Sequence, residues 1–417
     1  MWRLGFFFHE MAFGLLSVFI PLYLVAFNDT SMLGGPLVAL GIMTSIAVFA
    51  SIPASYIWGY LCDKTRRYKV FILLSFSSTA ILLVMMTLPF AQNILVFVVL
   101  YVVMQVLHIS HEAPKNVLVA ENYSRDEWEK SYGLYEGFTE IGYFIGLAIG
   151  LVFTGGLFTF AALSPAVLAT YTLYLCSGLS VVALVLSVIL VADPLIIFER
   201  RLVSIERKLN FAYRGMQSYT MNRFRMPRQE SFAGFAVALV MFSLATSIFF
   251  TPLPIFLSDI VSQYHTLGLS STSFVYFAYL LNSLGSMSGY FFIRNRAYSM
   301  DLRKQLPRFV LIRSMLIFGL VAAVQFVIAP NIITGLVLVL IGFAYGVYHI
   351  MMLSLSMEIT PQGRSGLFDS FIGIGTGIGS FLGPYIASNL SYLPVFLIAA
   401  AVFLLAFIIL KFIALRT

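Results

Sequence analysis

Residues 131–150, SYGLYEGFTEIGYFIGLAIG, recur as residues 364–383, RSGLFDSFIGIGTGIGSFLG, and this repetition decides how the chain is organised. Aligned from Ser131 and Arg364, the two segments share Gly, Leu, Phe, Ile, Gly, Ile, Gly and Gly. Two shorter matches have nearly the same spacing: GYLCDKTRR with GYFFIRNRA, from Gly59 and Gly289, and Pro-Leu with Pro-Leu, at Pro21 and Pro252. Three matches at nearly one spacing indicate that the chain contains two copies of one unit.

The composition indicates an integral membrane protein. The 417 residues are 60% hydrophobic and only 10% charged, with a mean hydropathy of +0.94, whereas soluble domains are about 25% charged. The two cysteines, Cys62 and Cys176, are too few for a disulfide framework or a Cys-based zinc site. The first apolar stretch, about residues 5–27, has no small-residue cleavage pattern after it and is interpreted as a first membrane helix.

Windows of about 20 apolar residues predict twelve membrane helices. Their centres fall near Leu16, Val48, Leu82, Val106, Leu147, Leu184, Leu244, Leu280, Leu320, Tyr345, Gly379 and Phe403. Every Lys and Arg except Lys115 is expected at the N-terminus, in alternate loops, at helix ends on the same side, or at the C-terminus. The positive-inside rule then places both termini in the cytoplasm of a multi-pass protein of the cell membrane. The net charge of +7 therefore reflects topology and gives no indication of nucleic-acid binding.

The repeat and the helix count together predict an all-α fold of two six-helix bundles. Because the repeat spacing spans six helices, an even number, the copies have the same orientation and are related by a pseudo-twofold axis along the membrane normal. The expected units are residues 1–191, a cytoplasmic linker at 192–230, and residues 231–417. Within the linker, FERRLVSIERKLNF has an apolar stripe at helical spacing and is expected to lie on the membrane surface as an amphipathic helix.

The loop GYLCDKTRRYK resembles the G-x-x-x-D-[RK]-x-G-[RK]-[RK] loop of the major facilitator superfamily, and the resemblance extends over essentially the whole chain. Arg66 stands where the family usually has Gly. The resemblance implies a conformational latch that stabilises the outward-facing closure, with Asp63 at the N-terminus of the eleventh helix, where the helix dipole favours a carboxylate. In the second copy Ile293 replaces the Asp, so the expected latch is one-sided. The motif positions are Gly59, Asp63, Lys64 and Arg67.

Other family motifs are incomplete. The R-x-x-Q-G pattern often found in the fourth helix keeps Gln105 but has Val102 and Val106 at its Arg and Gly positions. The fifth helix lacks the Gly-Pro pair associated with drug antiporters. A drug-export function is therefore not adopted from the resemblance.

Ionisable residues interrupt the fourth expected helix in the stretch HISHEAPKNVLVAE, residues 108–121. His108, His111, Glu112 and Lys115 fall at i, i+3, i+4 and i+7 and share one helix face, which Gln105 extends by a turn. A charge at mid-bilayer costs at least about 2.5 kcal/mol, so this face is expected to point into a bundle or a hydrated cavity. Pro114 is expected to kink the helix.

Neighbouring segments are expected to add to this face. Glu136 and Glu140 of the fifth helix, and His9 and Glu10 of the first, enter at a similar depth. The repeat aligns the Ala-Glu at Glu121 with the Met-Glu at Glu358, which maps the four residues onto an aromatic and polar face of the tenth helix. We therefore expect a proton-coupling and substrate-binding cavity formed by Glu10, Gln105, His108, His111, Glu112, Lys115, Glu136, Glu140, Tyr345, Tyr348 and His349.

Structural explanations compete with these functional ones. Lys115 with Glu136 or Glu140 is equally well explained as a fixed ion pair between two helices. Glu136 and Asp369 would each complement a helix dipole. His349 would serve as a core histidine with satisfied hydrogen bonds, and Tyr345 and Tyr348 as packing residues.

The leading hypothesis is a secondary active transporter that moves a small solute by alternating access and is coupled to protons through the ionisable residues. A second hypothesis is a divalent-metal transporter that uses the His/Glu cluster with His9 and Glu10 as ligands, although the spacing matches no standard metal motif. A membrane-embedded hydrolase or a sensor is a third, poorly supported alternative. We expect no enzymatic activity, no bound cofactor or resident metal, and a monomer whose partners are the solute, protons and the bilayer. The residues do not specify the solute.

Overall fold

The computed structural model describes residues 2–25, 28–115, 118, 128–153, 165–193, 231–264, 270–296, 302–326, 330–359 and 366–415, and these ranges contain helices and turns but no β-strand. The expected amphipathic helix lies in residues 194–230, outside the described residues. That helix and the domain limits built around it therefore stay predictions.

Six long helices form the first half of the chain: α1 (Arg3–Val25), α2 (Pro36–Thr65), α3 (Tyr68–Met85), α4 (Ile94–His108), α6 (Trp128–Val152) and α7 (Pro165–Leu190). The second half contains α9 (Phe232–Phe250), continued by the short α10 (Leu253–Tyr264), then α11 (Ser271–Arg296), α12 (Leu302–Phe326), α13 (Pro330–Ile359), α14 (Gly366–Leu390) and α15 (Tyr392–Ile408), which ends in a π-helical turn at Ile409–Ala414.

Within the described part of the chain, ten helical spans are long and apolar enough to cross a membrane. The two remaining long helices are α6, which carries Glu136 and Glu140, and α11, which is rich in Ser, Tyr and Asn. These two helices pack against each other. The polar residues at this contact face protein and not lipid. The mean hydropathy of α6 and α11 is therefore lower than that of helices exposed to lipid.

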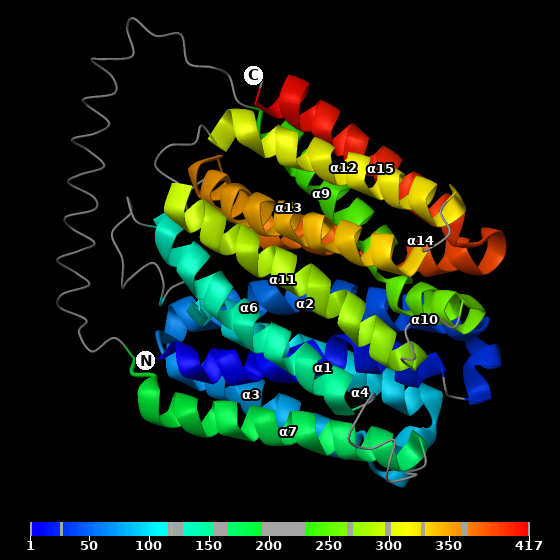
Figure 1. Ribbon diagram of the computed structural model, residues 1–417. Coiled ribbons are helices and arrows are strands. Elements are labelled where there is room, and N and C mark those ends of the chain that lie inside the picture. Colours follow the sequence, from blue (N-terminus) through cyan, green and yellow to red (C-terminus); the bar gives the residue numbers. More distant parts are fainter. Residues whose placement is uncertain are drawn as a thin grey trace, which may run out of the picture.

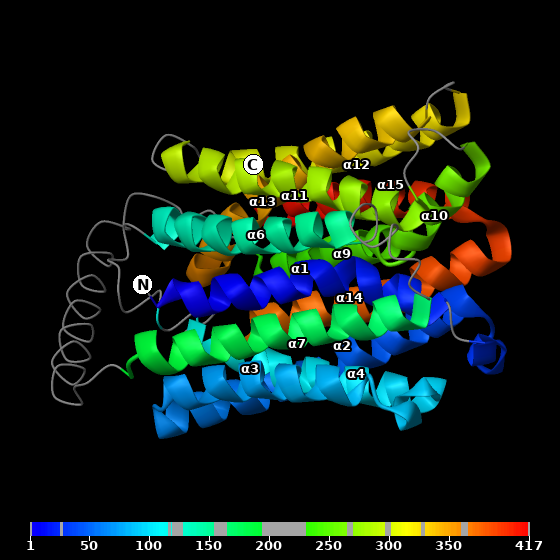
Figure 2. The ribbon, with the colours of Figure 1, turned by 60° about the horizontal axis from the view of Figure 1, so that its bottom comes forward.

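The helices form two six-helix bundles, as the repeat predicts. The helices of the first half lie in the lower part of Figure 1 and those of the second half in the upper part, with both termini at the same end. Two helix pairs join the bundles, α2 with α14 and α6 with α11, and in Figure 2 α6 again lies alongside α11. The chain is thus an all-α membrane protein with twelve transmembrane helices.

Glycines set the spacing of equivalent helix pairs in the two bundles. A Cβ on Gly142 of α6 would overlap the carbonyl oxygen of Phe7 of α1, and a Cβ on Gly375 of α14 would overlap that of Val240 of α9. The spacing of 233 residues that relates Gly142 to Gly375 also relates Phe7 to Val240. These glycines allow the helices to pack closely, and the same close contact occurs in both copies of the repeated unit.

Direct hydrogen bonds also connect the bundles. The hydroxyl of Tyr276 in α11 donates to the carbonyl oxygen of Leu15 in α1 at 3.0 Å, and the hydroxyl of Ser45 in α2 donates to the carbonyl oxygen of Gly377 in α14 at 2.9 Å. The ring of Tyr276 also lies against Gly150 of α6, where a Cβ would overlap it.

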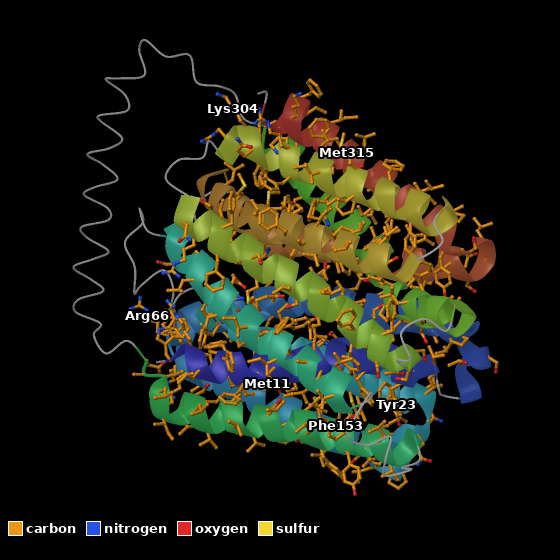
Figure 3. All side chains as sticks on the ribbon, in the orientation of Figure 1. Met11, Tyr23, Arg66, Phe153, Lys304 and Met315 are labelled. Atoms are coloured by element: carbon orange, nitrogen blue, oxygen red, sulfur yellow. The ribbon has the colours of Figure 1, made fainter. Side chains whose placement is uncertain are left out.

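Basic residues of both halves lie at one end of the helices. Arg66 at the end of α2 and Lys304 at the start of α12 lie at the end that holds both termini, whereas Tyr23 and Phe153 lie toward the opposite end (Figure 3). Arg66 is the C-cap of α2 and has a left-handed backbone, with φ 54° and ψ 25°. This conformation explains why the related loop motif has glycine at the same place.

Candidate functional site

The fourth span changes its helix type where its ionisable residues begin. α4 ends at His108, a 3-10 turn follows over Ile109–His111, and helical backbone resumes at residues 112–115. Pro114 has no N–H for the carbonyl group four residues earlier, and its ring crowds that turn. The 3-10 turn advances the chain by 3.0 residues per turn in place of 3.6. The expected single face is therefore divided: His111 is buried, whereas Glu112 stays partly exposed.

Three histidines meet between α1, α4 and the 3-10 turn. Nε2 of His9 lies 3.0 Å from Nδ1 of His108, and the ring centroids of His108 and His111 are 4.7 Å apart. One ring nitrogen from each residue lies within 4.8 Å of the other two. Imidazole nitrogens are common ligands of divalent transition metals, so this three-histidine cluster has donor atoms suited to such an ion.

Ser75 of α3 holds the histidines in place, and no sequence pattern had singled it out. Its hydroxyl donates to the carbonyl oxygen of His108 at 2.8 Å and lies 3.1 Å from Nδ1 of His111. Aromatic rings enclose the cluster: Phe13 stacks on His108 with ring centroids 4.1 Å apart, and Phe76 lies 4.2 Å from His9. Nδ1 of His9 is buried and has no hydrogen-bond partner in the described structure.

An ion-pair network extends from the histidines to α6. Nζ of Lys115 contacts the carboxylate of Glu112 and lies 3.9 Å from Oε1 of Glu136. The other oxygen of Glu112 lies 3.3 Å from Nε2 of His111. The expected pairing of Lys115 with α6 therefore involves Glu136. Glu140 forms no ion pair with Lys115 among the described contacts.

Glu140 instead connects the two bundles. Its Oε1 accepts a 2.6 Å hydrogen bond from the hydroxyl of Ser283 in α11. Both residues lie at the middle of their helices, Glu140 in Trp128–Val152 and Ser283 in Ser271–Arg296. A carboxylate of the first bundle is thus hydrogen-bonded to the second bundle at the middle of the two helices.

Two further predicted residues lie beside this network. Glu10 of α1 is half-buried and interacts electrostatically with Lys115, Glu112, Glu136 and Glu140. Gln105 of α4 is half-buried and pairs with Tyr101 one turn earlier on the same helix. We call the first-bundle residues that face one another here the ionisable layer: Glu10, His108, His111, Glu112, Lys115, Glu136 and Glu140.

The corresponding face of α13 is divided between two environments. The rings of Tyr345 and His349 stack with centroids 5.6 Å apart, and His349 interacts electrostatically with Glu136, Lys115 and Glu112. Tyr348 instead stacks on Phe242 of α9 inside the second bundle, at 3.6 Å between ring centroids. Tyr348 lies one position before His349 and is turned about 100° from it, toward α9.

The second bundle also holds a buried cation that the sequence reading missed. Arg313 was expected near a helix end, where its charge would follow the positive-inside rule. It lies instead in the middle of the span Arg303–Ala322, with only 1% of its surface exposed. The error arose because the ninth helix was centred near Leu320, which placed its start too late; α12 begins at Leu302.

The latch residues are only partly described. The backbone of GYLCDKTRR forms the end of α2 and the turn into α3, and nothing lies within 4 Å of a Cβ placed on Gly59. The side chain of Asp63 and the residues just before Gly366 lie outside the described structure. The proposed contact between Asp63 and the eleventh helix therefore stays a prediction, as do the roles of Lys64 and Arg67.

Comparison with solved structures gives transporters that share the fold. The nucleoside transporter NupG matches with a TM-score of 0.68 at 14% identity, covering 100% of this chain and 99% of that one. The xylose transporter XylE from E. coli gives 0.68 at 14% identity, covering 99% and 98%. The E. coli fucose:proton symporter FucP gives 0.60 at 16% identity, covering 99% and 97%. A sequence comparison with curated proteins gave no significant match.

The sequence profile of one family covers most of the chain. It matches residues 4–368, from the beginning of α1 into α14. The matched range contains the ionisable layer and the loop between α2 and α3. The chain belongs to the Major Facilitator Superfamily of transporters.

Proposed function

We propose that this protein moves a small solute by alternating access of its two bundles and that transport is coupled to protons through Glu140. The observation that carries the proposal is the 2.6 Å hydrogen bond from Ser283 to Glu140 across the bundle interface. Membership of a transporter family supports solute transport as the activity. Among the structural neighbours, FucP is a fucose:proton symporter, which supports proton coupling by analogy of fold.

The coupling step follows from the chemistry of this hydrogen bond. An ionised carboxylate accepts a charge-assisted hydrogen bond from Ser283, whereas a protonated Glu140 competes as a donor and accepts more weakly. Because the two residues belong to different bundles, rocking motions that separate the bundles must break the bond. Protonation of Glu140 therefore favours separation of α6 from α11, and release of the proton favours their contact.

Burial, the hydrogen bond from Ser283 and the surrounding charges together determine how easily Glu140 takes up a proton. Glu136 of the same helix and Glu10 of α1 are the charged groups that interact with it, and both repel its ionised form. Three tyrosines face it from α6, α11 and α13, namely Tyr143, Tyr290 and Tyr345. Lys115 is held by Glu112 and Glu136, so it stabilises those two carboxylates first.

The proposed function also includes the orientation of the protein in the membrane, its oligomeric state and its domain limits. We propose that both termini lie in the cytoplasm, because Arg66 and Lys304 lie at the end that holds the termini (Figure 3). A monomer in the cell membrane stays a prediction. The units are residues 1–191, the linker at 192–230, and residues 231–417. The protein is not expected to catalyse a chemical reaction or to need a cofactor.

The test measures proton movement directly. Purified protein is reconstituted into liposomes that contain a pH-sensitive dye, and D-xylose, L-fucose, uridine or sodium acetate is added outside. A solute that is transported with protons changes the internal pH in the wild type. Glu140→Gln should abolish this change while exchange of the same labelled solute across the membrane continues. Solute-driven proton movement that persists in Glu140→Gln would contradict the proposed role of Glu140.

A second candidate function rests on the three-histidine cluster, in which His9 joins His108 and His111. In this alternative the transported solute is a divalent transition-metal ion held by imidazole nitrogens. The mutual hydrogen bonding of His9 with His108 and the enclosing rings are explained equally well by packing. Equilibrium dialysis with Zn²⁺, Ni²⁺ and Co²⁺ distinguishes the two explanations. Metal transport predicts one bound ion per chain, lost in His9→Phe, whereas packing predicts no stoichiometric binding.

A further inference from the structure

Arg313 is a buried charge at the centre of the second bundle. Its guanidinium carbon lies 5.1 Å and 5.5 Å from the ring centroids of Phe242 and Phe250 in α9, 5.1 Å from that of Tyr345 in α13, and 5.0 Å from that of Phe403 in α15. We call these four rings the aromatic box. They attract the cation through their faces but supply no hydrogen-bond acceptor of comparable strength.

The charge has no anionic partner among the described residues. The described ion pairs involve the first bundle alone. Nε and Nη1 of Arg313 are buried and lack hydrogen-bond partners, and so does the hydroxyl of Tyr348, which interacts electrostatically with Arg313. Buried donors are normally satisfied, and a charged group in the membrane interior normally has a partner. Three unsatisfied polar atoms close together therefore indicate that an acceptor from outside the chain completes this place.

The repeat shows where this place lies in the molecule. The contacts that pair Gly142 with Phe7 and Gly375 with Val240 differ by 233 residues, and the same spacing carries His9 to Phe242. The register that aligns Glu121 with Glu358 carries His108 and His111 to Tyr345 and Tyr348. The surroundings of Arg313 thus correspond to the three-histidine cluster of the first bundle. The two polar interiors occupy equivalent positions on either side of the bundle interface.

Tyr345 connects Arg313 with that interface. Its ring contacts the guanidinium on one side and stacks on His349, and it interacts electrostatically with Glu136 and Glu140 of the first bundle. The side chain is half-buried, whereas Arg313 and Tyr348 are buried. Tyr345 therefore links the buried guanidinium of Arg313 to the residues of the bundle interface.

We propose that Arg313 and Tyr348 bind the carboxylate of an organic monoanion, so that the transported solute is a small monocarboxylate. This inference rests on the proposed transport function and names its substrate class. A single guanidinium among aromatic rings balances one negative charge, and no second cation in the described structure supports a doubly charged phosphate there. The aromatic box favours an apolar body attached to the carboxylate.

Ligand binding to the purified full-length protein tests the proposal without requiring transport. Thermal unfolding is followed in detergent with a thiol-reactive dye, because the thiols of Cys62 and Cys176 are buried in the folded state. The probes are acetate, propionate and benzoate at constant ionic strength, each compared with its uncharged amide. The carboxylates should raise the unfolding midpoint in a saturable manner, and the amides should not.

Variants then locate the binding site. Arg313→Met should weaken the apparent affinity for the carboxylates about tenfold or more, since it removes a charge-assisted hydrogen bond. Tyr348→Phe keeps the Arg313 cation, and it should weaken the apparent affinity for the carboxylates several-fold. Arg308→Met is the matched control, because Arg308 is an exposed arginine on the same helix whose guanidinium contacts Gln305 at 3.4 Å. It should bind as the wild type does.

Two results would overturn the proposal. One is that none of the three carboxylates shifts the wild-type midpoint more than its amide does, and the other is that Arg313→Met keeps the full carboxylate shift. If Arg313→Met fails to fold, Arg313→Lys and Tyr348→Phe decide, and unchanged affinity in both would reject the site. Proton coupling through Glu140 is measured separately. If the protein moves protons with a neutral sugar, the proposed monocarboxylate substrate is rejected and proton coupling through Glu140 is not.

Discussion

Gly146 of α6 lies directly against the carbonyl oxygen of Met11 in α1, and Gly379 of α14 lies in the same way against that of Leu244 in α9. At both contacts the helices approach so closely that a single methyl group would overlap the neighbouring backbone. Because backbone cannot move aside as a flexible side chain does, these contacts fix the helix spacing in each bundle.

Gly146→Ala should therefore destabilise the protein by about 1–3 kcal/mol, the range of overpacked sites. Gly178 of α7 is the matched control, because nothing lies within 4 Å of a Cβ placed on it and it is exposed. Gly178→Ala should be neutral or stabilise by up to about 1 kcal/mol through helix propensity. Reversible unfolding in mixed detergent measures both, and equal effects at the two positions would refute the packing role.

Removing Lys115 should leave Glu112 and Glu136 without their cation. The expected loss for Lys115→Met lies between roughly 1 kcal/mol, as for exposed pairs, and roughly 3 kcal/mol, as for buried ones, because Glu112 is partly exposed. The double variant Lys115→Met with Glu112→Gln should recover part of this stability. Lowering the pH should also reduce the loss, since protonated carboxylates no longer repel each other. Unfolding midpoints measured from pH 5 to pH 8 check both statements.

The same pair of variants separates a structural ion pair from a functional one. If Lys115 serves only to hold α6 against the end of the fourth span, the double variant that regains stability should also regain solute-driven proton movement in liposomes. Recovery of stability without recovery of transport would instead assign Lys115 a part in the transport cycle.

Arg66→Gly should stabilise the turn between α2 and α3. A non-glycine residue pays roughly 1–2 kcal/mol in the left-handed region, and glycine loses about 0.5–1 kcal/mol through the entropy of the unfolded chain. The expected net effect is a gain of about 0–1.5 kcal/mol in the free energy of unfolding. Arg67→Gly is the comparison, since Arg67 has φ −104° and gains nothing from glycine. Equal stabilisation by both changes would argue against backbone strain as the cause.

Tyr276→Phe should shift the equilibrium toward separation of the bundles. It removes the hydrogen bond to the carbonyl oxygen of Leu15, worth about 1 kcal/mol or roughly fivefold in a two-state ratio. Tyr279→Phe is the control, because its hydroxyl donates to the carbonyl oxygen of Phe250 within the second bundle. Spin labels at Val152 and Ser271 would report longer distances in the first variant only. Identical distance distributions in both would show that the Tyr276 bond does not hold the bundles together.

The fold could be predicted from the sequence because its determinants are repeated and periodic. Apolar windows in the sequence predict the twelve long helices, and the glycine repeat of α6 and α14 adds the duplication that relates them. The family loop was identified, and Arg66, which departed from it, has the backbone conformation that explains the usual glycine. Each of these features is a pattern of residue types along the chain, so a single sequence is enough to reveal it.

The site was predicted less completely because it depends on helix rotation and helix ends. His9 could be placed at the right depth, but its contact with His108 requires the orientation of α1 relative to α4. Ser75 belongs to no motif and shows its role only through contacts. Arg313 was overlooked because α12 begins earlier than its hydropathy indicates, which moves a basic residue from the membrane edge to the centre.

The polarity of α6 and α11 also has a consequence for biogenesis. α6 is synthesised and inserted into the bilayer well before α11. Until α11 is present, the carboxylates of α6 can contact only helices of the first bundle. The glycine contacts with α1 cover the other side of α6, because Gly142 lies two positions and therefore about 200° from Glu140. Completion of the second half then closes the remaining side, which makes the order of translation part of how this transporter reaches its folded state.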